Sequence, residues 1–170
     1  MNFLDPKAFQ FLKTIQDGFS TILDEYNTVQ TKGVPWPELF IYNKGWDVIG
    51  LKYQGKHREF RDMFPKTCEI FDSVKTPGIP TYGFSIMRPG CEIKPHKGYT
   101  ELQGPVLRGH LCLTTNPDSR LVVNDEERNW EVGEFLIFDD LNLHAAYNRG
   151  TTDRVVVLFD FSRYYKNKNF

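Results

Sequence analysis

Two histidines stand where predicted strands end, and their residue type is the first indication of chemistry in this chain. His96 lies in Pro-His-Lys-Gly, just after a strand pattern, and His144 follows Phe-Leu-Ile-Phe-Asp-Asp. They are 144 − 96 = 48 positions apart, which excludes a helical His-Glu-x-x-His zinc site and a local zinc finger. A lone histidine is more often a hydrogen-bonded structural residue. Two at separate strand ends can bind one metal from different strands of a barrel, and imidazole binds iron, zinc, nickel or copper.

The acid that commonly completes such a site is missing from its usual position. A facial triad needs two histidines and a carboxylate, usually two residues after the first histidine, and that position is Gly98. Either the metal has two protein ligands, or an acid comes from elsewhere. Asp139 and Asp140 lie shortly before His144, but we interpret them in the first place as turn residues at a strand end.

Two arginines lie in apolar strand patterns. Arg154 precedes Val-Val-Val-Leu-Phe, and Arg108 lies in Val-Leu-Arg-Gly-His-Leu-Cys-Leu. The two-residue period of a strand places Arg108 and His110 on one face, with Leu107 and Leu111 on the other. A buried arginine needs a partner. That partner is either a structural Asp or Glu, or a ligand carboxylate held by both arms of the guanidinium.

Short strands with turns between them must position these side chains. From Thr81 onward the pattern predicts six or seven strands, with turns near Pro89-Gly90, Asn116-Pro117-Asp118 and Asn148-Arg149-Gly150. Such spacing indicates an all-β sandwich, jelly roll or barrel with an open mouth that can hold a ligand.

The first half of the chain contains more helix. The spacing predicts one amphipathic helix from Asp5-Pro6 to Tyr26 that lies against the back of the sheet, with Gly18 weakening it but not breaking it. A strand over Trp46–Tyr53, a turn at 54–56 and a return strand from Glu59-Phe60 follow. A short helix over Phe64–Val74 ends this part.

Composition limits the class of protein. At 170 residues with 40% hydrophobic residues, we expect a single domain over 1–170, with a helical and mixed N-terminal buttress (1–80) and a jelly-roll core (81–165). The formal net charge of −1 gives no reason to expect nucleic acid or a membrane as partner. No apolar run suits a membrane span, no secretory signal is recognisable, and the three cysteines are far apart. A cytoplasmic location is the simplest expectation. His57, among charged neighbours, is expected at the surface.

Several short motifs, in this order, resemble those of the aspartyl/asparaginyl β-hydroxylase family. The resemblance extends from Tyr82 to about Asp160. The motifs are Ser85-Ile-Met-Arg-Pro-Gly, Pro95-His-Lys-Gly98, Leu107-Arg-Gly-His-Leu111, Gly133-Glu-Phe-Leu-Ile-Phe-Asp-Asp140, His144 and Arg154-Val155. The resemblance implies a mainly β protein with flanking helices, a double-stranded β-helix of the jelly-roll, cupin-like type.

The resemblance also implies the metal site. His96 and His144 would be the two ligands of Fe(II). Gly98 occupies the place where most related oxygenases have an acid, and this family characteristically lacks that acid, so that water would fill the position.

The same resemblance implies a cosubstrate site. Ser85 and Arg154 would hold the distal carboxylate of 2-oxoglutarate. Arg108 and His110 would lie near its metal-bound end, with Arg108 counted among the catalytic residues together with the two histidines.

The implied activity is an Fe(II)- and 2-oxoglutarate-dependent dioxygenase that uses O2 to hydroxylate an unactivated carbon. The substrate would be a small molecule or a peptide, and the target the β-carbon of an amino acid, an amino-acid-derived molecule or a peptidyl residue. In members that act on acidic side chains we expect basic residues where this chain has Gly83 and Val106. The segment Lys97–Pro105 is either a loop that contacts substrate or an ordinary surface loop.

Three alternatives remain open at this point. A halogenase would use the same carboxylate-free iron site. A non-catalytic jelly-roll module would bind a sugar or a small acid. A zinc hydrolase would need a third protein ligand and a general base, which the sequence does not offer convincingly.

Overall fold

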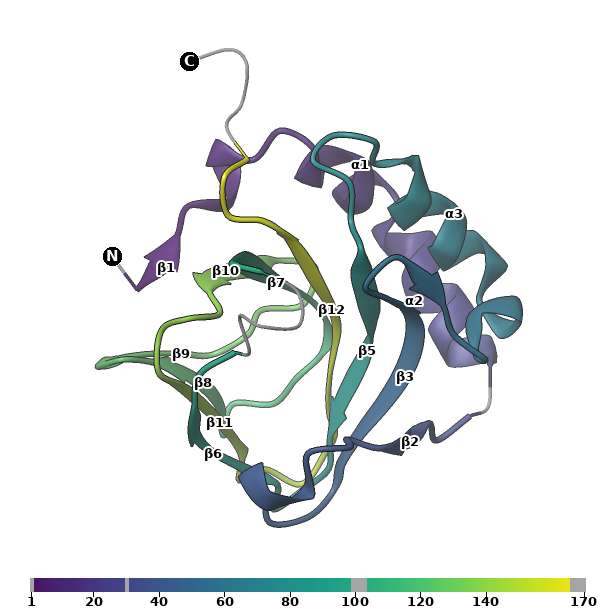
Figure 1. Cartoon of the computed structure of the whole chain (residues 1–170). Coiled ribbons are helices and arrows are strands. Elements are labelled where there is room, and N and C mark those ends of the chain that lie inside the picture. The colour runs from purple at the N-terminus through teal and green to yellow at the C-terminus, as the bar shows by residue number, and fades with distance from the viewer. Residues whose placement is uncertain (1, 30, 99–103, 166–170) are drawn as a thin grey trace.

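Two antiparallel sheets face each other in the computed structural model, which describes residues 2–29, 31–98 and 104–165. The larger sheet has eight strands and the smaller has four. Figure 1 shows them curved around a common interior, with the helices outside the larger sheet. The chain therefore has the jelly-roll, double-stranded β-helix fold.

The larger sheet runs in the order β1-β10-β7-β12-β5-β3-β2, with β4 paired to β3. Its strands are β1 (Phe3–Leu4), β2 (Val34–Pro35), β3 (Trp46–Tyr53), β4 (Lys56–His57), β5 (Thr81–Met87), β7 (Val106–Thr114), β10 (Phe135–Asp139) and β12 (Arg154–Ser162). β3 confirms the predicted strand. The predicted return strand at Glu59-Phe60 is wrong, because the return pairs Lys56 and His57 with β3 directly after the turn.

The smaller sheet runs in the order β6-β11-β8-β9. Its strands are β6 (Glu92–His96), β8 (Ser119–Val123), β9 (Glu126–Arg128) and β11 (His144–Asn148). From Thr81 onward the described residues therefore contain eight strands, β5 to β12. This exceeds the predicted six or seven, because β9 continues from β8 through a tight turn.

The predicted N-terminal helix is interrupted at Gly18. It consists of a 3-10 turn (Pro6–Ala8), α1 (Leu12–Asp17) and α2 (Phe19–Thr28), and Gly18 caps α1 and α2. A β-carbon at position 18 would lie 2.5 Å from Ile70 Cδ1 on α3 (Pro65–Ser73). The close crossing with α3 therefore favours a glycine there, and the prediction of one continuous helix is wrong. Short 3-10 turns also occupy Leu39–Ile41 and Arg61–Met63.

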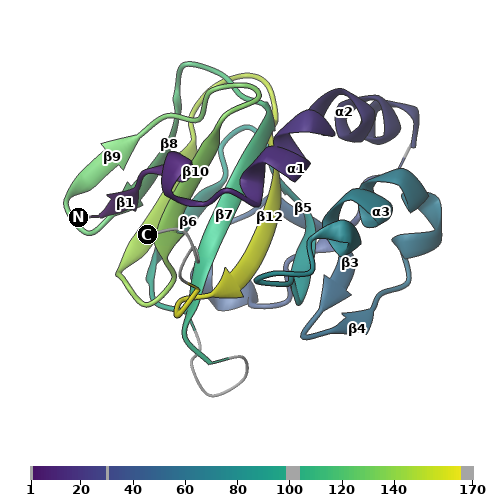
Figure 2. The same ribbon diagram turned by 90° about the horizontal axis from the view of Figure 1, so that it is seen from above.

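The larger sheet separates two hydrophobic cores. The outer face of β3, β5, β7 and β12 packs on α1, α2 and α3, through residues such as Ile49, Phe84 and Leu111. Figure 2 shows these helices on one side of the larger sheet and the smaller sheet on the other. A second core fills the space between the sheets and includes Trp130 and Leu158. The inner face that remains is where the polar residues of the site lie.

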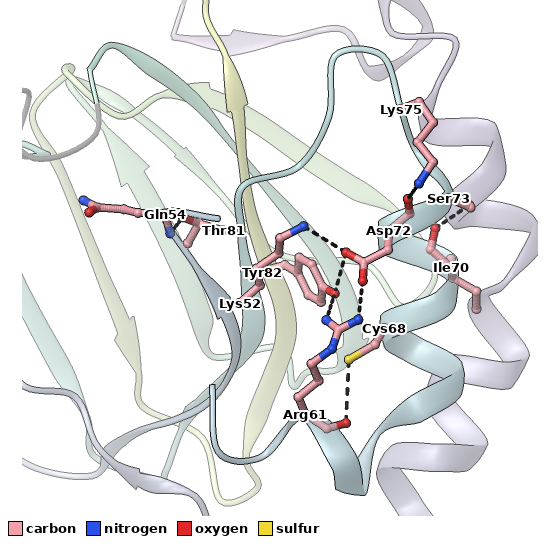
Figure 3. Close-up of polar contacts among 10 residues, drawn as sticks. All are labelled: Lys52, Gln54, Arg61, Cys68, Ile70, Asp72, Ser73, Lys75, Thr81 and Tyr82. Atoms are coloured by element: carbon pink, nitrogen blue, oxygen red, sulfur yellow. Dashed lines mark hydrogen bonds and ion pairs between the residues drawn. The ribbon is translucent and has the colours of Figure 1, made fainter. Parts of the chain in front are cut away.

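A polar cluster centred on Asp72 of α3 joins the helices to the sheet (Figure 3). Asp72 accepts hydrogen bonds from Lys52 Nζ at 3.0 Å and from the Tyr82 hydroxyl at 3.0 Å. It also pairs with Arg61, which donates to the Tyr82 oxygen at 2.8 Å. Burial alone would raise the pKa of Asp72, but the hydrogen bonds from Arg61, Lys52 and Tyr82 outweigh it and lower the pKa below 3.8.

Asp72→Asn is expected to lower the free energy of unfolding by about 1–3 kcal/mol at neutral pH, since two cations lose their partner. The folded-state pKa of Asp72 is depressed, so its contribution is present above pH ~4 and is lost as pH falls through the folded pKa. Urea unfolding at pH 7 and at pH 3 measures both effects. Asp17→Asn, at an exposed pair with Lys13, is the control and should change stability by less than about 0.5 kcal/mol. An Asp72→Asn effect no larger than this control would contradict the stabilising role.

Candidate active site

His96 and His144 lie directly opposite each other on neighbouring strands. His96 ends β6, His144 begins β11, and the two are register partners. Their ring centroids are 4.2 Å apart. Residues 48 positions apart in the sequence (144 − 96) thus present two imidazoles to one point between the sheets.

Both imidazoles are oriented by the same local contact. His96 Nδ1 lies 2.8 Å from the Lys94 carbonyl, and His144 Nδ1 lies 2.8 Å from the Asn142 carbonyl. A carbonyl only accepts, so each Nδ1 carries the proton and each Nε2 keeps its lone pair for a metal. Such a contact on the far ring nitrogen is the usual way in which proteins fix a metal-binding histidine.

Burial keeps His144 and His110 neutral. Burial, with the neighbouring His96 as a smaller cause, lowers the pKa of His144 to about 3. Burial also lowers the pKa of His110 well below 6.5, and the charges of Arg154 and Arg108 act in the same direction. Neutral imidazole is the form that binds a metal.

Asp140 occupies the space that an acid at position 98 would need. Its side chain is 3% exposed, and Oδ1 lies 3.6 Å from His144 Nε2. A β-carbon on Gly98 would lie only 1.8 Å from Asp140 Oδ2, and the Gly98 amide donates to the Asp140 carbonyl at 2.7 Å. The interpretation of both acids as turn residues holds for Asp139, which accepts from the Leu141 amide. It holds for Asp140 as well, which begins the turn after β10, but Asp140 is in addition buried beside the histidines.

Gly98→Asp is expected to destabilise the protein without creating a third metal ligand. The new side chain meets the Asp140 carboxylate, so the melting temperature should fall by roughly 3–10 °C, given about 1–3 kcal/mol for overpacking. Thermal melts and Zn(II) titration measure both effects. The double variant Gly98→Asp/Asp140→Gly removes the clash and should recover stability. A single variant that is as stable as wild type and binds metal more tightly would contradict the placement of Asp140.

Arg108 is held by two aspartates. Its Nε and Nη2 donate to the two oxygens of Asp160 at 2.8 and 2.9 Å, and Nη1 lies 2.8 Å from Asp140 Oδ1. Burial disfavours its charge, but Asp140 and Asp160 outweigh this and raise the pKa of the guanidinium. The sequence left open whether the partner of this arginine is a structural acid or a ligand carboxylate. The structure shows structural acids, Asp140 and Asp160. Arg108 thereby fixes the position of Asp140 beside His144.

Arg154 has a different environment. It is 1% exposed, and its guanidinium carbon lies 4.6 Å from the centre of the Trp130 ring. Its Nη1 makes a long contact of 3.4 Å to the Ser85 carbonyl. Within the described ranges, its buried Nε has no hydrogen-bond partner. Desolvation lowers the pKa of Arg154 to about 10. The side chain remains charged at neutral pH, and its environment suits an anionic ligand.

Two tryptophans orient the polar groups beside Arg154. Trp46 Nε1 donates to Ser85 Oγ at 2.9 Å, so the Ser85 hydroxyl keeps its own proton to donate. Trp130 Nε1 donates to His110 Nδ1 at 3.2 Å, so His110 carries its proton on Nε2. That buried Nε2 has no partner among the residues that the structure describes.

These donors converge on one small pocket between the sheets. The pocket is lined by His96, His144, Ser85, Arg108, His110 and Arg154, among others. The placement of Arg108 and His110 on the inner face, with Leu107 and Leu111 in the outer core, confirms the predicted alternation of this strand. The group that the sequence predicted is therefore together in space, while its individual roles remain predictions.

The residues present fit the metal and cosubstrate that the resemblance implies. His96 and His144 offer ligand nitrogens, and Arg154, Ser85 and His110 offer one cation and two neutral donors for a dicarboxylate. Among the described residues there is no group of three His, Cys, Asp or Glu side chains that could hold a metal.

A larger cleft of about 420 Å³ opens from this pocket toward β2 and β3. Lys97 and Gly98 line it. Lys97–Pro105 was expected to be either a loop that contacts substrate or an ordinary surface loop. Most of this segment, residues 99–103, lies outside the described residues. His57 is exposed, as predicted, and does not line the cleft.

Sequence reasoning missed or undervalued four residues of the site. They are Asp140, Asp160, Trp46 and Trp130. Asp160 is an acid within an otherwise apolar strand, Val-Val-Val-Leu-Phe-Asp-Phe, and a buried acid predicts a buried cation as its partner. The tryptophans carried no such signal, because their type is equally common in a core.

Comparison with known proteins gives consistent matches. The profile of the family described as Aspartyl/Asparaginyl beta-hydroxylase matches residues 16–164. Human "Aspartate beta-hydroxylase domain-containing protein 2" is 31% identical over 164 residues, which cover 88% of this chain and 43% of that protein. Human "Aspartyl/asparaginyl beta-hydroxylase" is 30% identical over 160 residues, covering 89% of this chain and 21% of that protein. The chain thus spans less than half the length of these relatives.

Two further matches come from bacteria. The "Ornithine lipid ester-linked acyl 2-hydroxylase" of Rhizobium tropici is 38% identical over 90 residues, covering 51% of this chain and 31% of that protein. A solved structure of an oxidoreductase of the 2OG-Fe(II) oxygenase family from Burkholderia pseudomallei superposes with a TM-score of 0.59 at 12% identity. It covers 85% of this chain and 79% of that chain, and supports the fold. None of the helices in the described ranges has the length and hydropathy of a membrane crossing.

Proposed function

The chain belongs to the aspartyl/asparaginyl beta-hydroxylase family, and from this premise we propose that it is an Fe(II)- and 2-oxoglutarate-dependent dioxygenase. It hydroxylates an unactivated carbon of a small-molecule or peptidyl substrate. Iron(II) with 2-oxoglutarate and O2 would supply the oxidant, with succinate and carbon dioxide as the products of the cosubstrate.

One observation carries this proposal. Two imidazoles, each with Nδ1 held by a backbone carbonyl, face the same pocket as Arg154, a buried cation with no carboxylate partner among the described residues. A buried charge without a partner is costly to a fold. A dicarboxylate cosubstrate supplies that partner.

Different residues position the metal and the cosubstrate. His96 and His144 bind the metal from adjacent strand ends. Arg154 and the Ser85 hydroxyl bind the distal carboxylate, with Trp130 and Trp46 fixing their orientation. These contacts hold the cosubstrate in one orientation next to the metal.

His110 and Arg108 act at the metal-bound end. The proton on His110 Nε2 suits a carboxylate or keto oxygen. Arg108 acts through Asp140, whose carboxylate it holds 3.6 Å from His144 Nε2. In this position Asp140 can accept a hydrogen bond from a water molecule beside the histidines.

The same acid supports hydroxylation over halogenation. Chloride at the position left by Gly98 would lie against the Asp140 carboxylate, and Arg108 is already shared between two aspartates. The site therefore offers an anion little net attraction, whereas water can donate to the acid.

The named relatives indicate two kinds of target. Their names refer to aspartyl and asparaginyl residues and to an ester-linked acyl chain. We propose a carbon near a carboxyl-derived group as the target here, either the β-carbon of an amino-acid unit or a carbon of an acyl unit. The cytoplasmic location and the lack of nucleic-acid or membrane partners rest on sequence alone and stay predictions.

Succinate formation tests this function. The purified chain with Fe(II), ascorbate, 2-oxoglutarate and O2 should release succinate slowly even without the primary substrate. The metal chelator EDTA should stop the release. A folded chain that binds sugars or small acids but forms no succinate would instead support the non-catalytic module.

A further inference from the structure

Gly50, in the middle of β3, is a glycine that the fold does not require. Its backbone has no positive φ. A β-carbon there would lie 3.7 Å from Arg58 Cγ and 3.9 Å from Arg58 Cβ, both ordinary contacts, and within the described residues no other atom comes within 4 Å. Glycine in a strand interior weakens the strand and often marks close approach of a ligand. The pairing of β3 with β5 shifts register between Gly50 and Lys52, but the space in front of Gly50 is not filled by packing within the described residues.

Gly83, its partner on β5, is different. The two glycines are opposite each other in the sheet. A β-carbon on Gly83 would lie 2.6 Å from the Ile49 carbonyl oxygen and 3.1 Å from Gly50 Cα. The packing of β3 on β5 therefore requires Gly83. Together, Gly50 and Gly83 form a strip of bare backbone on the floor of the cleft.

This strip continues directly from the candidate iron and cosubstrate pocket. Gly50 pairs with Gly83, Gly83 with Leu158, and Leu158 with His110. With strands about 4.8 Å apart, Gly50 lies about 14 Å from His110 along this row. Leu158 lines both the small pocket that contains His144 and Arg154 and the larger cleft. A molecule that presents a carbon to the metal can therefore extend over the two glycines.

The walls of the cleft combine apolar and charged side chains. Val34, Trp36, Val48 and Phe60 line it, and so do the charged Lys52, Arg58 and Glu59. Trp36 stacks on Trp46 with ring centroids 4.2 Å apart, which fixes the orientation of its ring. Near the histidines, Asp140 and Asp160 share one cation, Arg108.

We propose that the strip at Gly50 and Gly83 seats an apolar segment of the primary substrate, and that Gly50 determines how large this segment can be. The substrate class is then a molecule with an aliphatic or aromatic portion next to the hydroxylated carbon, rather than a short acidic side chain. This inference rests on the proposed function, because the strip is defined relative to the metal and cosubstrate pocket.

The test uses probes and a graded set of variants. Hexanamide and the polar N-acetylglycinamide, which have similar length, are titrated by saturation-transfer NMR into protein loaded with Zn(II) and 2-oxoglutarate. Wild type should bind hexanamide and discriminate against N-acetylglycinamide. Gly50→Leu should weaken hexanamide binding at least about fivefold, and Gly50→Ala should weaken it less. Lys56→Leu, on the adjoining strand and outside the cleft lining, is the matched control and should bind like wild type.

The proposal also predicts what does not change. Gly50→Leu should keep or raise the melting temperature, because a side chain replaces glycine in a strand. The variant should keep the affinity for 2-oxoglutarate, because Gly50 does not line the small pocket that contains His144 and Arg154.

Two results would overturn this inference but leave the proposed function standing. In the first, Gly50→Leu binds hexanamide as tightly as wild type does. In the second, wild type binds both probes equally well. Wild type that binds neither metal nor 2-oxoglutarate would instead reject the proposed function, and the inference with it.

Discussion

Replacing His96 or His144 by alanine is expected to reduce succinate formation at least about 100-fold, since loss of even an indirect support of a metal ligand costs about 10–100-fold. With no third His, Cys, Asp or Glu ligand among the described residues, each substitution leaves a single protein ligand. The metal affinity should fall together with turnover. Equilibrium dialysis with Fe(II) and a succinate assay measure the two quantities on the same preparations.

His57→Ala is the matched control for these substitutions. His57 is exposed on β4 and lies outside the cleft, so both metal binding and turnover should equal those of wild type. Either site variant retaining full metal affinity while folded would show that the histidine pair is structural.

Arg154→Met is expected to weaken 2-oxoglutarate binding at least about 30-fold, while stability stays the same or rises. The loss follows from removing a buried charged donor, which costs about 2–5 kcal/mol of binding. The gain follows because the free protein no longer buries a cation whose Nε has no hydrogen-bond partner in the described part of the chain, and methionine fills similar space. Calorimetric titration with 2-oxoglutarate and urea unfolding measure the two opposite effects.

Two further variants sharpen this prediction. Arg154→Lys keeps the charge but loses the planar fork, so its affinity should lie between those of methionine and wild type. Arg149→Met removes an exposed arginine and should leave 2-oxoglutarate binding unchanged. An Arg154→Met protein that unfolds more readily and still binds 2-oxoglutarate would assign Arg154 to the core.

The strand pattern of the second half was predictable because its side chains alternate regularly between two environments. Arg108 and His110 alternate with Leu107 and Leu111, and each pair faces its own core. The histidine pair could be found because each histidine stands at a strand end, where the rigid frame meets the mouth of the site.

Contacts between distant segments were not predictable from local patterns. The break at Gly18 depends on how closely α3 crosses, through Ile70. The burial of Asp140 depends on Arg108 and on the space beside Gly98. A turn-forming acid and a site acid look the same in the sequence until the arginine opposite is known.

Gly50 is a residue whose position at the cleft became visible only in the structure. A glycine in a strand pattern weakens the predicted strand, and the sequence offers no reason for it. The structure shows that its backbone is unstrained and that the space above it belongs to the cleft. An unexplained glycine in a strand is therefore a useful indication of where a ligand approaches.

The most direct test is an anaerobic titration of the metal-free protein with Fe(II) and 2-oxoglutarate, followed by visible absorption. We predict that the weak metal-to-ligand charge-transfer band of the chelate appears in wild type and His57→Ala. It should be absent or much weaker in His96→Ala, His144→Ala and Arg154→Met. Folded wild-type protein that gives no band would contradict the iron and 2-oxoglutarate site, and the non-catalytic binding module would then be the better account of this chain.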